Sequence, residues 1–188
     1  MVKINNIYLN NFRNFTNYKI QFDDKLNIFF GSNGCGKTNI IEGISLIAKG
    51  RGIRNVNISN LIKKGQDSFC IKNNLEIQNN HYEIEIYSEQ KNDKFKKIIK
   101  INDDNSKDSL DFLNKSISFL TFLPEMERLF QASPSYRRNF IDRLIFSSRN
   151  TYNTLVNKYK KLLLERIKIL QNNSLDYDWL NNIEKEIS

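Results

Sequence analysis

The stretch Gly31–Thr38, GSNGCGKT, matches the pattern G-x-x-x-x-G-K-[ST] at every fixed position. Its three glycines allow backbone conformations in which successive N–H groups point inward at an anion. Lys37 adds a positive charge, and the Thr38 hydroxyl is an oxygen ligand of the kind that Mg²⁺ prefers. The stretch therefore predicts a phosphate-binding loop, or P-loop.

The flanking residues supply the context that such a loop needs. Leu26–Phe30 (LNIFF) is an apolar run that stops at Gly31, and we expect it to form a buried strand. From Thr38 onward, apolar residues recur at helical spacing, which predicts a largely buried helix that ends near Gly50. A helix that begins at the loop directs its unpaired N–H groups and positive dipole end at the phosphates.

We therefore assign nucleotide binding, with ATP and Mg²⁺ as cofactors, to the whole loop. Lys37 is expected to reach the β- and γ-phosphates, and Thr38 to coordinate the Mg²⁺ that the nucleotide carries. The assigned residues are Gly31, Ser32, Asn33, Gly34, Cys35, Gly36, Lys37 and Thr38.

The composition is that of an ordinary globular protein, since 39% of the 188 residues are hydrophobic and 27% are charged. No run of about 18 apolar residues is present, so we expect no transmembrane helix and no membrane partner. The N-terminal segment alternates polar and apolar residues and lacks the apolar core of a signal peptide. Cys35 and Cys70 have no metal-type spacing, and a cytoplasmic location is expected.

The net charge of +8 is concentrated near the loop. Residues 1–65 contain ten Lys and Arg against three Asp and Glu, whereas residues 66–188 contain nineteen against eighteen. This imbalance suits a polyanionic ligand such as nucleic acid, although a solvated basic face is the alternative for any single residue. The candidates for DNA-backbone contacts are Lys49, Arg51, Arg54, Lys63 and Lys64, with Arg137 and Arg138 as secondary candidates.

Alternating patterns predict further strands. Residues 2–9 and 18–22 alternate as strands do, and residues 69–101 fit an antiparallel sheet with one solvated face. The apolar run Ile117–Leu123 (ISFLTFL) is a second candidate for a buried strand.

The last third of the chain is predicted to be helical. Ser133 followed by Pro134 is typical of a helix start, here for a helix that continues to about Phe146. A longer segment from Tyr152 to Leu170 carries an apolar stripe at helical spacing. This stripe is expected to pack either on the rest of the domain or on a partner helix.

The groups that cleave a triphosphate are not evident in the sequence. P-loop ATPases hold Mg²⁺ and position water with an acidic residue that follows an apolar strand. The candidate strand Ile117–Leu123 runs instead into Pro124 and Glu125. No Ser/His/Asp set or carboxylate pair stands out, so no catalytic residue is assigned.

Separated blocks of this sequence resemble the RecF family of DNA replication and repair proteins, which have an ABC-type ATPase head related to SMC proteins. Leu9–Phe15 (LNNFRNF) is similar to the start of that family, and Gly31–Arg54 (GSNGCGKTNIIEGISLIAKGRGIR) resembles its P-loop, following helix and basic turn. Phe122–Ile145 (FLPEMERLFQASPSYRRNFIDRLI) resembles a family block in which a Pro-Glu turn precedes Ser-Pro and two arginines. Asn39 and Glu42 separate the pattern from those of kinases and GTPases.

The resemblance implies an α/β fold, that of a P-loop NTPase of the ABC-ATPase-head type. Residues 1–130 would form the N-terminal part of the head, an incomplete lobe I with an antiparallel β section, and residues 131–188 a long helical arm that starts the second lobe. Family members continue for roughly another domain, which supplies the signature motif, the Walker B carboxylate and the switch histidine. The chain resembles the N-terminal half of such a protein, so hydrolysis by this chain alone is not expected.

The function implied by the resemblance is that of an ATP- and DNA-binding protein in DNA replication, recombinational repair and the SOS response. Such a protein would bind single-stranded or gapped DNA and support recombinase loading. Its implied partners are DNA, recombination-mediator proteins and, in an ATP-dependent homodimer, a second copy. Two alternatives stay open: a small-molecule or nucleoside kinase with the same loop, and an inactive head fragment that only docks a partner.

Overall fold

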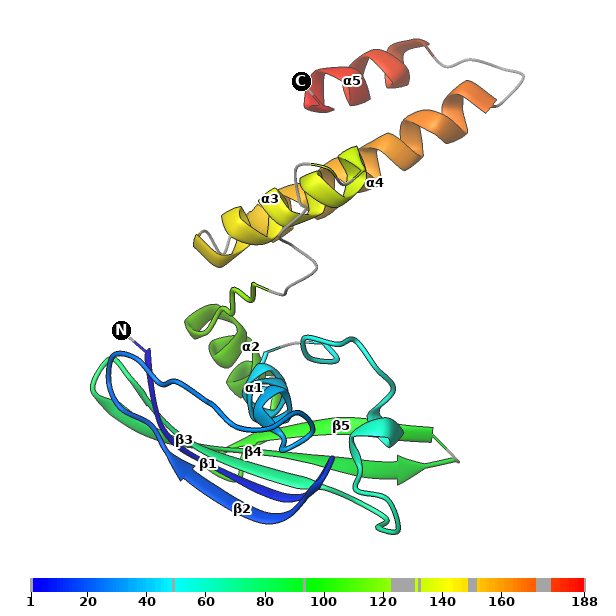
Figure 1. Ribbon diagram of the computed structural model, residues 1–188. Helices are drawn as coiled ribbons and strands as arrows, with labels where there is room; N and C mark the ends of the chain where they lie inside the picture. Colours follow the sequence, from blue (N-terminus) through cyan, green and yellow to red (C-terminus); the bar gives the residue numbers. More distant parts are fainter. Residues whose placement is uncertain are drawn as a thin grey trace. The chain divides into compact units, whose positions relative to one another are not determined.

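The structure is a computed structural model that describes residues 2–48, 50–92, 94–122, 131, 133–148, 152–171 and 177–187 (Figure 1). The chain divides into two compact units, Met1–Thr121 and Phe122–Ser188. The first unit contains the sheet and the P-loop, and the second is helical where it is described.

The first unit is built on one antiparallel sheet with the strand order β2-β1-β3-β4-β5. The strands are β1 (Val2–Phe12), β2 (Phe15–Gln21), β3 (Cys70–Ile77), β4 (Asn80–Lys91) and β5 (Lys94–Ile101). The antiparallel sheet predicted over residues 69–101 is confirmed, and the two N-terminal strands extend it. Strands β2 and β5 form its two edges.

One face of the sheet is apolar and is covered by two helices. Alternate residues of the central strands point to this face, as the two-residue period of a strand requires. They form one core with α1 (Lys37–Ser45) and α2 (Lys107–Ser116), which lie on the same side of the sheet in Figure 1. Burial of each large aliphatic side chain contributes about 1.5–3 kcal/mol. The fully buried strand residues are Ile7, Leu9, Phe12, Ile71, Leu75, Ile84 and Ile86.

Helix α1, which begins at the P-loop, lies close to the sheet. A Cβ on Gly43 would lie 3.0 Å from Cδ2 of Leu9, so the missing side chain allows the helix to approach β1. After the helix ends, Lys97 of β5 donates hydrogen bonds to the carbonyl oxygens of Leu46 at 2.9 Å and Ala48 at 2.8 Å. Carbonyl oxygens at a helix C-terminus lack partners within the helix, and the lysine satisfies two oxygens there.

A buried ion pair joins α1 to the turn between β1 and β2. Glu42 of α1 is fully buried, and its carboxylate accepts hydrogen bonds from Nε of Arg13 at 2.9 Å and Nη2 at 2.8 Å. Arg13 has φ 55°, a left-handed conformation that is uncommon for a residue with a side chain. Arg54 adds a third contact, from Nη1 to Oε2 of Glu42 at 3.1 Å. The carboxylate therefore connects the β1–β2 turn, α1 and the connector that follows α1.

The first helix of the second unit among the described residues is the predicted one. Helix α3 (Pro134–Ser148) is capped by Ser133, whose Oγ accepts a hydrogen bond from the Tyr136 N–H at 3.4 Å. Tyr152, at the start of the next helix, donates a hydrogen bond to Oδ1 of Asp142 at 2.7 Å. The start of α3 is thus confirmed at the predicted serine and proline.

Helices α4 (Tyr152–Gln171) and α5 (Tyr177–Ile187) pack as a pair. They bury a small apolar cluster of Leu162, Ile169 and Ile183. The predicted stripe of α4 therefore packs in part on a neighbouring helix of the same chain, while other apolar side chains of α4 stay exposed. No helix among the described residues is long and apolar enough to cross a membrane.

The prediction of a buried strand before the P-loop is wrong. Residues 26–30 form no strand, and Leu26, Ile28 and Phe30 expose 71%, 74% and 91% of their surface. Only Phe29 packs against the core from this run. A strand forms only where a neighbouring strand accepts and donates its backbone hydrogen bonds. The five described strands pair with one another in a sheet that does not include residues 26–30. An apolar run in a sequence predicts that its side chains are buried, but it does not show which part of the fold they pack against.

The second predicted buried strand is also wrong over its described part. Residues 117–122 are not in a strand. Ile117 packs into the core, but Leu120 and Phe122 are exposed. Leu123, Pro124 and Glu125 lie outside the described residues.

The helix after the loop is shorter and less buried than predicted. Helix α1 ends at Ser45 instead of near Gly50, and Ile41 on its outer side is exposed. Helix α2 and the short 3₁₀ helix η1 (Ile58–Leu61) were not predicted. Helix α2 begins after an N-cap serine that the sequence shows, since Oγ of Ser106 accepts a hydrogen bond from the Ser109 N–H at 3.3 Å.

We predict that Glu42→Gln lowers the free energy of unfolding of the first unit by about 3 kcal/mol. Removing one partner of a buried ion pair costs about 3–5 kcal/mol, and the lower end applies because both arginines are partly exposed. The measurement is urea denaturation followed by circular dichroism. Asp67→Asn is the control, since Asp67 is exposed and the change removes the same charge. An equal loss in the two variants would contradict a specific role for Glu42.

Candidate functional site

The P-loop turns sharply into α1, and glycine is required at its last bend. Gly36 has φ 109°, and a Cβ at this position would lie 2.5 Å from Cζ of Phe15. Any other residue would therefore meet both backbone strain and a clash with the β1–β2 region. Residues 31–35 are exposed, so the loop is open to a ligand.

Lys37 folds back over the loop. Its Nζ donates hydrogen bonds to the carbonyl oxygens of Gly31 at 2.7 Å and Ser32 at 2.8 Å, and lies 3.8 Å from Sγ of Cys35. Within the described part of the chain, no carboxylate lies at ion-pair distance from this ammonium. Its charge is thus oriented by neutral carbonyl oxygens and can pair with an anion in the loop.

Two asparagines brace the loop from outside the P-loop pattern. Nδ2 of Asn14, in the β1–β2 turn, donates to the carbonyl oxygen of Cys35 at 3.4 Å. Oδ1 of Asn14 accepts from Nδ2 of Asn39 at 2.8 Å, and Oδ1 of Asn39 accepts from Nη1 of Arg54 at 3.0 Å. Since Arg54 also contacts Glu42, one network runs from the loop to the buried carboxylate.

The N-terminal end of α1 has the properties of an anion site. Its N-cap residue, Gly36, provides no side-chain cap, and the first turn contains no acidic residue. N–H groups at a helix start, together with the positive end of the helix dipole, favour a negatively charged ligand. The phosphates of a nucleotide fit these donors, and Thr38 lies exposed at the same end, where a nucleotide-bound Mg²⁺ would need its hydroxyl.

The predicted DNA-contact residues near the loop lie in different settings. Arg54 is engaged in the network behind the P-loop, which favours a structural role for its guanidinium. Lys49 lies outside the described residues, and the secondary candidates Arg137 and Arg138 lie at exposed positions of α3 in the second unit.

The other three candidates belong to the first unit. Arg51 is exposed, and its Nη1 lies 3.3 Å from Oδ1 of Asn57. Lys63 donates a hydrogen bond to the Thr16 hydroxyl, and Lys64 is exposed. Of these three candidates, Arg51 and Lys64 are therefore the exposed ones, and neither belongs to the network behind the P-loop.

No catalytic residue emerges from the described residues. They contain no group of three or more His, Cys, Asp or Glu side chains that could hold a metal ion. Sequence reasoning also missed that Arg13 and Asn14 support the loop. The signal was present in Glu42, because an acidic residue within an otherwise apolar helix needs a buried cationic partner.

Comparison with known proteins agrees with this geometry. A family model described as an AAA domain matches residues 6–188. Two proteins named DNA replication and repair protein RecF, from Rickettsia felis and Rickettsia massiliae, are each 34% identical to this chain over 185 residues. The match covers 98% of this chain and 50% of each relative, so the chain spans about half the length of the curated relatives it matches.

Two solved structures share the fold. They are described as the recombination mediator protein RecF in the RecFOR pathway, one as RecF-ATPrS and one as RecF-ATP. Their TM-scores are 0.72 and 0.69 at 26% and 27% identity, and the match covers 99% of this chain and 50% of each structure. The antiparallel sheet, P-loop and helices are therefore part of a P-loop ATPase head of the ABC type. The chain belongs to the AAA domain family and corresponds to an N-terminal, RecF-like portion of such a head.

Proposed function

We propose that this chain is the nucleotide-binding part of a RecF-like protein of DNA replication and recombinational repair, and that Gly31–Thr38 binds Mg-ATP. The observation that carries the proposal is the loop itself. Lys37 lies over it without an acidic partner among the described residues, and α1 directs its N-terminal end at the same space. A solved relative described as RecF-ATP supports ATP as the nucleotide.

Hydrolysis is proposed to need a polypeptide that completes the head. The side chains of Leu26, Ile28 and Phe30, immediately before the loop, form an exposed apolar segment of the kind that marks an interaction surface. A strand beside this segment would bury these side chains and satisfy the backbone groups. The same polypeptide would supply the acidic Mg²⁺ ligand that a P-loop ATPase uses. The relatives, which are about twice as long as this chain, support such a completing part.

The biological setting is proposed from the relatives and from the charge distribution. We infer that the protein acts in the cytoplasm on single-stranded or gapped DNA, in recombinational repair and the SOS response. Its proposed partners are recombination-mediator proteins that support recombinase loading, and a second copy in an ATP-dependent homodimer. The basic excess of residues 1–65 suits DNA. The free thiols of Cys35 and Cys70 suit a reducing compartment.

Lys37→Ala should weaken Mg-ATP binding roughly tenfold to a hundredfold, because a charge-assisted hydrogen bond contributes about 1.5–3 kcal/mol. Isothermal calorimetry measures the affinity, and circular dichroism checks that the fold is kept. Lys19→Ala is the matched control, since Lys19 is exposed on the edge strand β2. Equal affinities of wild type and Lys37→Ala would refute the assignment of this lysine. If the wild-type chain does not bind ATP, the alternative of an inactive head fragment that only docks a partner is favoured.

The isolated chain should release phosphate from ATP at a rate close to background. The groups that position water and hold Mg²⁺ contribute several orders of magnitude to the rate, and none is assigned here. Addition of a polypeptide that corresponds to the other half of a full-length relative should restore turnover, and this turnover should be lost in Lys37→Ala. Robust turnover by the wild-type chain alone, absent in Lys37→Ala, would instead point to an overlooked carboxylate and to the kinase-like alternative. Glu125 is the first residue to test in that case.

Arg51→Gln should lower the affinity for DNA of unrelated sequences to a similar extent. Loss of one phosphate contact should also reduce the slope of log affinity against log salt by about 0.7–0.9. Fluorescence anisotropy with labelled oligonucleotides at several salt concentrations measures both effects, with Lys19→Gln as control. Arg51 is chosen over Arg54 because a change at Arg54 would also disturb the network behind the loop. An effect confined to one DNA sequence would argue against a backbone contact.

A further inference from the structure

A recess at the edge strand β5 gathers positive charge outside the P-loop. It has a volume of about 660 Å³ and is formed by β5 together with the connector that follows α1. Its polar lining consists of Arg51, Asn57, Ser59, Lys94, Lys96 and Lys97. Four of these side chains are cationic, and no acidic residue lines the recess. Because no residue of Gly31–Thr38 lines it, the recess is distinct from the proposed nucleotide site.

Three of the four cations are accessible. Arg51, Lys94 and Lys96 are all exposed. Lys94 and Lys96 are two residues apart on β5, so they leave the strand on the same side, separated by about 6.6 Å along it, and this side is opposite to that of Lys97. In the sheet, Glu89 of β4 lies directly across from Lys96, but it does not line the recess. The accessible charges are therefore arranged along an edge, where an extended ligand can follow them.

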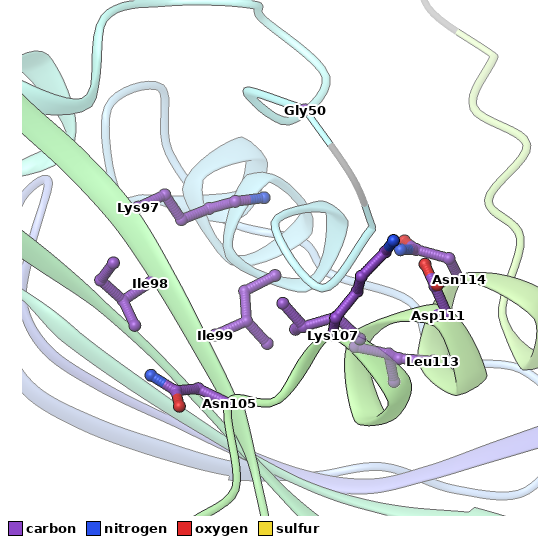
Figure 2. Close-up of a pocket in the computed structure, with 10 residues that line it drawn as sticks. Gly50, Lys97, Ile98, Ile99, Asn105, Lys107, Asp111, Leu113 and Asn114 are labelled. Atoms are coloured by element: carbon purple, nitrogen blue, oxygen red, sulfur yellow. The ribbon is translucent and has the colours of Figure 1, made fainter.

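Lys97 has a structural role in this wall. Its ammonium is largely buried and donates to the carbonyl oxygens of Leu46 and Ala48, and burial lowers its pKa to about 8. Figure 2 shows Lys97 reaching from β5 beside a second pocket, of about 360 Å³, that Gly50 and Lys97 also line. That pocket contains Asp111 next to Lys107, so its charge is mixed. The basic recess is thus distinct from this pocket. Lys97 connects β5 to the residues that follow α1 through its two hydrogen bonds.

We propose that the recess formed by Arg51, Lys94 and Lys96 binds the sugar-phosphate backbone of nucleic acid. The inference rests on the proposed DNA-binding function. It adds two phosphate-binding lysines of β5, Lys94 and Lys96, to the contact proposed for Arg51. Exposed cations along a strand, with the amide of Asn57 and the hydroxyl of Ser59 beside them, match the donors that contact phosphates in sequence-independent binding. A cationic lining favours a polyanion such as a chain of phosphates over an uncharged or basic partner, since an uncharged partner would leave these charges unpaired and a basic one would be repelled.

The test compares two double variants of the full chain that lose the same charge. Lys94→Gln with Lys96→Gln removes the cations of the recess. Lys19→Gln with Lys25→Gln removes two exposed lysines from β2 and the segment after it, at the other side of the sheet. The probes are fluorescein-labelled oligo(dT) and a labelled duplex of mixed sequence, titrated by anisotropy at several salt concentrations. ATP affinity is measured on the same samples by calorimetry, and circular dichroism verifies the fold.

The β5 variant should bind both DNA probes more weakly and should lower the salt slope by about 0.7–0.9 for each lost contact. Its ATP affinity should be unchanged, because the P-loop is not altered. The β2 variant should behave as wild type. If the β5 variant binds DNA as tightly as the wild type, or if both variants are weakened equally, the recess is not a DNA-binding site, although the protein still binds DNA elsewhere. A wild-type chain that binds ATP but neither DNA probe would overturn the recess and the DNA-binding part of the proposed function together.

Discussion

The position of the P-loop depends on one buried carboxylate. Glu42 is fully buried, and its carboxylate accepts hydrogen bonds from Nε and Nη2 of Arg13 and from Nη1 of Arg54. A buried charge of this kind is tolerated only when it is paired and hydrogen-bonded. Through Asn39 and Asn14 the same network reaches the carbonyl oxygen of Cys35 in the loop. The loop is therefore held in place by the β1–β2 turn, which lies outside the phosphate-binding pattern.

The loop has a supported side and an unsupported side. Helix α1 packs on the antiparallel sheet and is joined to it by Gly43, Glu42 and Lys97. The segment that enters the loop, Leu26–Phe30, has no strand partner in the described structure and exposes most of its apolar side chains. In the proposed function this asymmetry corresponds to two steps, binding and cleavage of the nucleotide. Phosphate binding needs the amides, Lys37 and Thr38, whereas cleavage needs groups on a neighbouring strand.

Sequence reasoning succeeded where the physical signal is local. The P-loop, the start of α3 at Ser133 and the alternation of β3 to β5 follow from spacing alone. It failed where the answer depends on distant residues. Arg13 and Glu42 are 29 residues apart, and the burial of Leu26–Phe30 depends on a neighbour that its pattern does not specify. The lysines of β5 were not singled out from the sequence for another reason, because acidic residues nearby in the sequence balance their charge, and only the fold shows that no acidic residue lines the recess.

In the proposed function, the amides of Gly34–Thr38 bind the phosphates of Mg-ATP. Hydrogen exchange of the backbone amides, measured by mass spectrometry with and without Mg-ATP, tests this binding residue by residue. We expect nucleotide to slow exchange at residues 34–38, while the amides of residues 26–30 continue to exchange rapidly because no strand pairs with them. Unchanged exchange at residues 34–38 under saturating Mg-ATP, or protection confined to another part of the chain, would show that the loop amides do not bind the nucleotide.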